Sequence, residues 1–212
     1  MKKVICIILS AILILSVSVS VFADSEKEMA AKELEKYGIV ERNHLGALTI
    51  DGPVTRAGMV KMLMLMVKAE EGSTERYFTD VPAEHWAFQY IAQASNLGII
   101  NGMGDGTFAP DDNITYEQAM KMIVCALGYG RIAERRAAYP IGYAIVASNL
   151  GVTPHSARLS DDANRGDIMI MLAKALDVPI VVPVETENGT EYKVQNGENG
   201  ESFVTLRTKL EK

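Results

Sequence analysis

One pattern of residues occurs three times along this chain and constrains its fold more than any other feature. Each copy has a glycine between two apolar or aromatic residues, a loop, and then a polar residue that opens an apolar run. The glycine and that polar residue are 17 positions apart in two copies (Gly38 to Thr55, Gly98 to Thr115) and 13 apart in the third (Gly151 to Asn164). This repetition predicts three related helix-loop-helix units in one pseudo-symmetric body.

The second helix of each unit is predicted to be buried on nearly all sides. The runs 59–67, 120–127 and 168–176 are almost wholly apolar, and eight of the eleven methionines lie in them. A helix that is apolar around most of its circumference belongs in a core, so we expect these three helices to pack together. A methionine stripe could also bind metal, but filling of irregular core space is the favoured interpretation.

The remaining elements are placed by their start and stop signals. Trp86 is expected on a helix that opens at Pro82, where it would be a buried anchor or lie partly exposed at a groove. The third unit should have a break or a new helix near Pro140. The predicted helices are 25–37, 55–69, 82–97, 115–127, one from about 140 to 150, and 164–176; the predicted strands are 190–194 and 202–206.

The N-terminus has the pattern of an export signal. Lys2 and Lys3 precede an apolar stretch from Val4 to Phe22, and a small-residue cleavage site ends at Ala23. A retained membrane anchor is the alternative. Removal of residues 1–23 leaves 19 basic against 27 acidic residues, a net charge of about −8, so nucleic acid is not an expected partner. Cys125 then remains alone, and no internal disulfide can form.

The start of each second helix is the candidate site. Thr55, Thr115 and Asn164 are predicted N-caps, and Thr115 with Gln118 fits the capping box. Arg56 and Arg165 follow two of these caps, although a cation there opposes the helix dipole. An arginine beside free helix N–H groups would form an anion pocket. An ordinary arginine paired with a nearby acid is the other interpretation.

Residues 77–130 carry a specific set of motifs. They are Phe78-Thr-Asp80-Val81, Trp86-Ala87, Leu97-Gly98-Ile99-Ile100-Asn-Gly102, Asp105-Gly106-Thr-Phe108-Ala-Pro110 and Ile114-Thr115-Tyr116-Glu117-Gln118. With these motifs the chain resembles the S-layer homology domain, which is usually found as three tandem copies. The flanking units match in part, through Thr55-Arg56-Ala57 and Asn164-Arg165.

The resemblance implies an all-α fold, a three-pronged spindle around a central three-helix bundle. It divides the chain into a signal peptide (1–23), three repeats (24–71, 77–130 and 131–178) and a tail (179–212). We expect the tail to form a short β-like hairpin, or the start of a further region that belongs to a longer protein.

The resemblance also implies a function. Domains of this family attach exported proteins non-covalently to the bacterial cell wall, through a secondary wall polysaccharide that often carries a pyruvate ketal. The implied binding residues are Arg56, Arg165, Tyr116, Thr55, Thr115 and Trp86. Tyr116 stands where the family has an arginine, so that groove should be altered or silent, and restoring the arginine should tighten binding. Other surface-layer proteins are further candidate partners, and no membrane contact is expected after signal removal.

Two other classes of function remain open. A protein-interaction scaffold of the surface layer would use the same body to dock another protein. An enzyme lacks support, because the sequence has no nucleophile motif and the histidines at 44, 85 and 155 have no metal-ligand spacing. The segment 105–117 lacks the alternating ligands of an EF-hand and has Pro110 inside it, so we expect neither metal nor cofactor.

Overall fold

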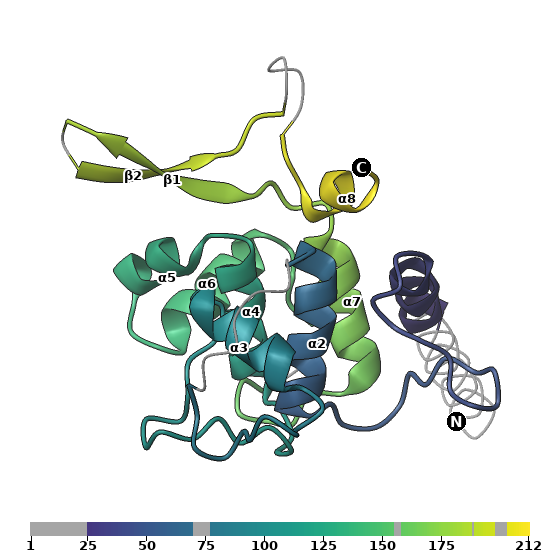
Figure 1. The fold of residues 1–212 in the computed structure, drawn as a ribbon. Helices are drawn as coiled ribbons and strands as arrows, with labels where there is room; N and C mark the ends of the chain where they lie inside the picture. Colours follow the sequence, from purple (N-terminus) through teal and green to yellow (C-terminus); the bar gives the residue numbers. More distant parts are fainter. Residues whose placement is uncertain (1–24, 70–76, 155–157, 188, 198–202) are drawn as a thin grey trace, which may run out of the picture.

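A computed structural model describes residues 25–69, 77–154, 158–187, 189–197 and 203–212; the predicted signal peptide lies outside these residues. The fold is mostly helical, with one small antiparallel sheet (Figure 1). Residues 25–36 are helical. The elements that follow are α2 (Arg56–Val67), α3 (Phe88–Asn96), α4 (Tyr116–Ala126), α5 (Gly130–Arg136), α6 (Ile141–Asn149), α7 (Arg165–Ala175), β1 (Val181–Thr186), β2 (Gly189–Val194) and α8 (Leu206–Leu210). None of the described helices is long and apolar enough to cross a membrane.

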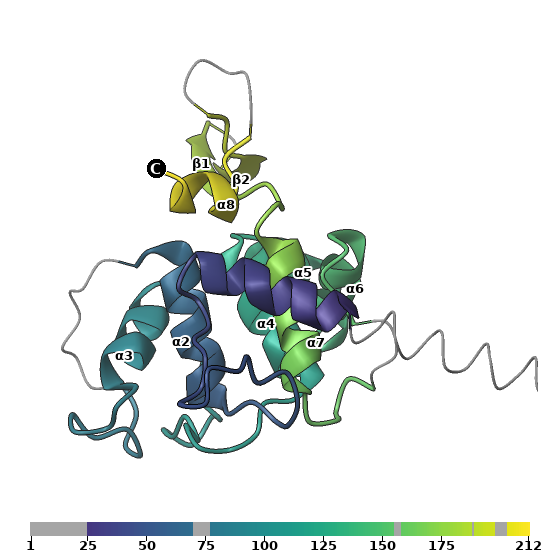
Figure 2. The ribbon, with the colours of Figure 1, turned by 90° about the vertical axis from the view of Figure 1, so that its right-hand side faces the viewer.

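The helices α2, α4 and α7 form the core, as predicted from their apolar runs. Figures 1 and 2 show them in the middle of the helical body, and α4 contacts both α2 and α7. All eight methionines in these helices are buried: Met59, Met62, Met64, Met66, Met120, Met122, Met169 and Met171. Core filling therefore accounts for the methionine stripe.

The starts of these three helices are joined to distant loops by backbone contacts. The first helical N–H of each donates to a loop carbonyl that is far along the chain: Arg56 to Asp112 (2.9 Å), Tyr116 to Asp161 (3.1 Å) and Arg165 to Gly52 (2.8 Å). Isolated β-bridges link the same segments: Pro53 with Asn164, Thr55 with Asn113, and Thr115 with Asp162. The first segment thus contacts the second, the second the third, and the third the first.

The cap predictions are confirmed, and one helix boundary is wrong. The Thr115 hydroxyl and the Gln118 side chain form a complete capping box, and Asn164 caps α7 through its side chain. The third unit breaks as expected, with α6 starting directly after Pro140. The helix predicted from Pro82 begins only at Phe88, because turns occupy the preceding residues. Trp86 therefore lies before α3 and not on it.

The tail partly follows the prediction. The strands β1 and β2 form a hairpin from Val181 to Val194. The turn joins Thr186 to Gly189, and does not lie between the predicted strands 190–194 and 202–206. The strand predicted at 202–206 is only partly formed, and residue 202 lies outside the described residues. Phe203 and Thr205 each make one isolated bridge, to Asn196 and Pro179, and Thr205 also caps the short helix α8 with a hydroxyl that accepts from Thr208.

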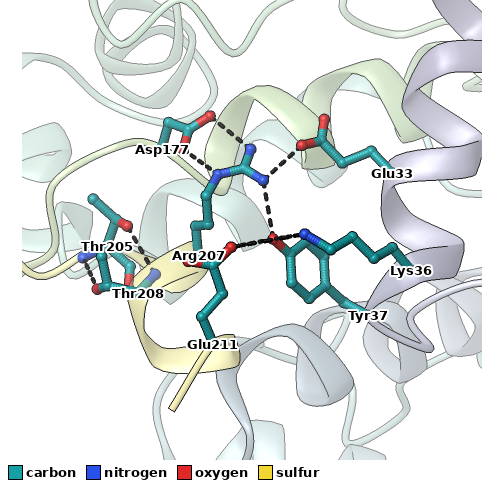
Figure 3. A network of polar contacts seen from close by, with 8 residues as sticks. All are labelled: Glu33, Lys36, Tyr37, Asp177, Thr205, Arg207, Thr208 and Glu211. Atoms are coloured by element: carbon teal, nitrogen blue, oxygen red, sulfur yellow. Dashed lines mark hydrogen bonds and ion pairs between the residues drawn. The ribbon is translucent and has the colours of Figure 1, made fainter.

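Arg207 fastens α8 to the rest of the body (Figure 3). Its Nη2 donates to Asp177 Oδ2 at 2.8 Å, and its Nη1 lies 2.6 Å from Glu33 Oε1. Tyr37 donates its hydroxyl to Glu211 at 2.8 Å and accepts a hydrogen bond from Arg207. The network joins the first unit, the end of α7 and the tail, so the tail packs on the repeats.

Loss of this network should cost stability in a way that depends on pH. Asp177 has a pKa below its ordinary value of 3.8, chiefly because Arg207 hydrogen-bonds to its carboxylate. That stabilisation is present above the ordinary pKa and is lost as pH falls through the lower, folded value. We expect Arg207→Gln to lower the free energy of unfolding by about 1 kcal/mol at pH 7, a modest effect because solvent screens this largely exposed pair.

Urea unfolding at pH 7 and at pH 3 measures the difference between Arg207→Gln and the parent chain. The difference should shrink at the lower pH. Arg136→Gln, at the exposed end of α5, is the control and should be near neutral at both pH values. A difference that is equal at both pH values would contradict a role for the Asp177 pair.

Candidate functional site

A cleft of about 270 Å³ lies between the start of α2, the loop at 99–103, and α4. The start of α2 contributes Arg56, the loop and α4 contribute most of the lining, and the segment before α6 contributes Tyr139. The lining residues are Arg56, Ile99, Ile100, Asn101, Gly102, Met103, Gln118, Lys121, Met122 and Tyr139. We call this cleft the first groove.

Arg56 is the central charged group of the first groove. The residue is only 3% exposed, its Nε donates to the Phe108 carbonyl at 2.8 Å, and its guanidinium lies 4.5 Å from the centre of the Phe108 ring. Among the described residues, none forms a hydrogen bond or ion pair with its terminal nitrogens. Burial lowers the pKa of this guanidinium, and the nearby Tyr139, Asp112 and Asp80 oppose the shift. The group stays protonated, and its outer nitrogens line the groove with donors to offer.

Lys121 supplies a second cation to the same groove. Its ammonium lies 5.2 Å from the centre of the Tyr139 ring. The side-chain amide of Asn101 is oriented so that its nitrogen donates to the Ile100 carbonyl, and its oxygen then accepts a hydrogen bond from Lys121 at 3.2 Å. Tyr139 donates its hydroxyl to Glu117 at 3.2 Å; burial and then the charge of Glu117 raise the pKa of Tyr139 to about 12. The groove therefore combines two cations with an aromatic wall.

The helix N–H groups are not available to a ligand, and this part of the sequence prediction is wrong. In α2, Arg56 and Ala57 donate their N–H groups to carbonyls of the second unit, while Gly58 donates to the Thr55 hydroxyl at 3.1 Å. The Thr115 hydroxyl is likewise engaged, accepting from Gln118 at 3.4 Å. Over the described residues, the donors left free here are the terminal nitrogens of arginine side chains and not the helix ends.

Arg165 occupies the corresponding position in the third unit. Its Nε donates to the Thr49 carbonyl at 2.8 Å, as that of Arg56 does to Phe108. Over the described ranges, its terminal nitrogens likewise form no hydrogen bond or ion pair. On α2, Lys61 stands six residues after its cap, as Lys121 does on α4, and lies 3.9 Å from Glu41. Burial lowers the pKa of Arg165.

Trp86 occupies the position before α3 that Tyr139 occupies before α6. Each aromatic residue stands two positions before its helix, α3 or α6. Trp86 is 56% exposed and stacks on His85 with 5.7 Å between ring centres. It is a surface residue with an open face, so the interpretation as a buried anchor is wrong.

Tyr116 differs from the two arginines in its partners as well as its charge. It is buried, it donates its hydroxyl to Asp167 at 2.5 Å, and it accepts from the Asn164 N–H at 3.2 Å. Burial first, and the Asp167 hydrogen bond second, raise its pKa to about 12. Lys27 lies 3.8 Å from Asp167. The polar groups of Tyr116, Asp167, Asn164 and Lys27 are thus paired with one another. On α7, Ile170 stands six residues after the cap, the position that Lys121 has on α4.

The sequence prediction found the arginines and Trp86 but missed the lysines and Tyr139. A usable signal existed: a lysine follows each threonine cap by six residues, at Lys61 and Lys121.

Comparison with known proteins identifies the family. The family model described as the S-layer homology domain matches residues 77–120, the stretch that supplies the loop and Gln118 of the first groove. This chain is an S-layer homology domain protein. It is 35% identical over 143 residues to a protein named cell surface protein of Thermoanaerobacter kivui, a match covering 64% of this chain and 18% of that protein.

Two further relatives define how widely the domain is shared. The middle cell wall protein of Brevibacillus brevis is 31% identical over 210 residues, covering 92% of this chain and 20% of that protein. An endoglucanase of Bacillus sp. is 33% identical over 98 residues, covering 46% of this chain and 10% of the enzyme. This chain spans about a fifth of the length of the first two relatives.

Proposed function

We propose that this chain attaches an exported bacterial surface protein to the cell wall by binding an anionic wall polysaccharide in two grooves. The observation that carries the proposal is the shared state of Arg56 and Arg165. Each is anchored through Nε to a loop carbonyl while its terminal nitrogens make no hydrogen bond or ion pair within the described part of the chain. Two such groups at equivalent places in a repeat suit an anion on a repeating polymer.

The other lining groups fit a sugar that carries an acidic substituent. A guanidinium offers two parallel donors to a carboxylate, and Lys121 adds a point charge 5.2 Å from the Tyr139 ring centre. The faces of Tyr139 and Trp86 can pack against the apolar side of a sugar ring. A pyruvate ketal would supply the carboxylate, and this choice follows the family resemblance.

The proposal includes the three-unit arrangement that creates the grooves. We take the repeats to be 24–71, 77–130 and 131–178, with 179–212 as the tail, in a pseudo-three-fold spindle. Each groove then takes its arginine from one unit, its loop and lysine from the next, and its aromatic residue from the last. By this rule the second groove combines Arg165, Lys61 and Trp86. The ring of contacts between the starts of α2, α4 and α7 supports the arrangement.

The two grooves differ in where their acidic groups lie. In the first, Lys121 faces the neutral Asn101, whereas in the second Lys61 lies beside the carboxylate of Glu41. Asp112 and Asp80 act instead on Arg56 in the first groove. A carboxylate offsets part of the positive charge that an anionic ligand would meet, at the lysine in one groove and at the arginine in the other.

A protein-interaction scaffold is the second candidate function. The names of the relatives fit it as well, since cell surface and cell wall proteins also contact one another. The open arginine nitrogens favour the polysaccharide. We do not propose catalysis for this chain.

Wall retention tests the main proposal. The parent chain should sediment with purified wall sacculi and should stay in solution once the secondary polymer has been stripped from them. Each of Arg56→Ala and Arg165→Ala should weaken retention about 10- to 100-fold, because a charge-paired contact is lost. The double variant should fall to background.

The matched control removes two exposed arginines from α5, Arg131→Ala with Arg136→Ala, and should leave retention unchanged. Thermal melting checks that the double groove variant still folds, because Arg56 also packs on Phe108. Equal sedimentation with stripped and intact sacculi would refute polysaccharide binding and favour the scaffold.

Trp86 offers a separate readout of the second groove, because it is the one tryptophan in the chain. Added wall polysaccharide should shift its emission to shorter wavelength and protect it from acrylamide quenching. Arg165→Ala should abolish both changes, and Arg56→Ala should leave them in place. A response that survives Arg165→Ala but not Arg56→Ala would place Trp86 in the other groove.

A third groove, at Tyr116, should bind the polysaccharide only after two substitutions. In Tyr116→Arg the new guanidinium would meet the Asp167 carboxylate, so we expect little gain in retention. Adding Asp167→Gln frees the guanidinium and also releases Lys27. In the Arg56→Ala background, the pair should recover wall retention at least tenfold over Tyr116→Arg alone. Equal retention by the single and paired variants would show that this groove is closed for another reason.

A further inference from the structure

The β1–β2 hairpin has one blocked edge and one open edge. On the outer side of β1, Val181 donates its N–H to the Leu127 carbonyl at 3.0 Å, and Pro183 has no N–H to offer. This edge faces the end of α4. The outer edge of β2 lies on the other side of the hairpin, which extends above the helical body in Figure 1.

The register fixes which groups of β2 point outward. Gln195 donates its N–H to the Ile180 carbonyl, so bonded pairs recur at every second position from that pair. Thr190, Tyr192 and Val194 must then direct their backbone N–H and C=O groups away from β1. In the described part of the chain, no hydrogen bond reaches these six backbone groups, and unpaired edges of this kind are templates for a further strand.

The side chains along this edge are self-complementary. In an antiparallel pair of two identical strands centred on Tyr192, Glu191 of each copy stands opposite Lys193 of the other. Glu191 and Lys193 are exposed and lie on the same face, 2.8 Å apart within one chain. We propose that two copies of this chain associate through β2, to form a four-stranded sheet in the order β1-β2-β2-β1.

The charges of Glu191 and Lys193 favour this register over the two registers that are shifted by one residue. Moving the centre by one residue toward the start of β2 puts Glu191 opposite Glu191, and moving it the other way puts Lys193 opposite Lys193. Like charges directly opposite on a sheet are unfavourable, and opposite charges are favourable. The centred register also pairs all six outward backbone groups of each strand. The Tyr192 ring lies on the opposite face, 5.8 Å from the Arg135 guanidinium of α5, and leaves the charged face clear.

Cysteine trapping tests both the contact and its register. In a background of Cys6→Ser with Cys125→Ala, Tyr192→Cys should cross-link to itself, since paired Cα atoms would lie about 5.5 Å apart. An equimolar mixture of Thr190→Cys and Val194→Cys chains of different tag length should give the mixed product. Neither alone should cross-link efficiently, because the two cysteines would be about 13 Å apart. Glu84→Cys, an exposed site away from the hairpin, measures random collision.

Charge reversal gives an independent measurement by sedimentation equilibrium. Lys193→Glu or Glu191→Lys alone should weaken association roughly tenfold, because two like-charge contacts appear in the pair. Glu191→Lys combined with Lys193→Glu should restore it. Cross-linking of Thr190→Cys alone at the rate of the mixture, or of all variants at the rate of Glu84→Cys, would overturn the proposal. So would a double reversal as weak as the single ones.

Discussion

The hydrogen bonds between the first turn of each central helix and the loop of another unit hold this structure together. The first N–H groups of a helix have no partner inside it, and caps or water usually satisfy them. Here carbonyls from a different unit do so, for Arg56, Tyr116 and Arg165 alike. The start of each central helix therefore depends on a loop that is distant along the chain. The same contacts bring each first side chain against a neighbouring loop, which is what creates a groove.

Features that depend on local sequence were predictable. A threonine with glutamine three residues later identifies the start of α4, because the capping box involves only those residues. The burial of α2, α4 and α7 follows from apolar runs too long for one exposed face. The positions of Arg56 and Arg165 at helix starts follow from the same signals, and two key groups of the candidate site were found in this way.

Features that depend on long-range contacts were not predictable. The occupied helix N–H groups, the exposed face of Trp86 and the anchoring of α8 by Arg207 each need partners far along the chain. Predicted strands at 190–194 and 202–206 place the hairpin turn between them, yet the pairing of Val181 with Val194 puts the turn earlier. The β-branched and aromatic residues at 202–206 favour a strand, but Phe203 and Thr205 make only isolated bridges, and Thr205 also caps α8.

The first side chains of the three central helices, Arg56, Tyr116 and Arg165, meet the cost of burying a polar group in two different ways. A guanidinium held under neighbouring loops loses hydration, and the lowered pKa values of Arg56 and Arg165 express that cost. Tyr116 avoids the cost, because a neutral hydroxyl there satisfies Asp167 and the Asn164 N–H within the chain. The hydroxyl at position 116 is therefore satisfied by groups of this chain. The arginines keep donors unused, and an anion that reached them would recover interaction energy that the protein alone leaves unrealised. The unit with the best internal pairing is thus the one least suited to bind.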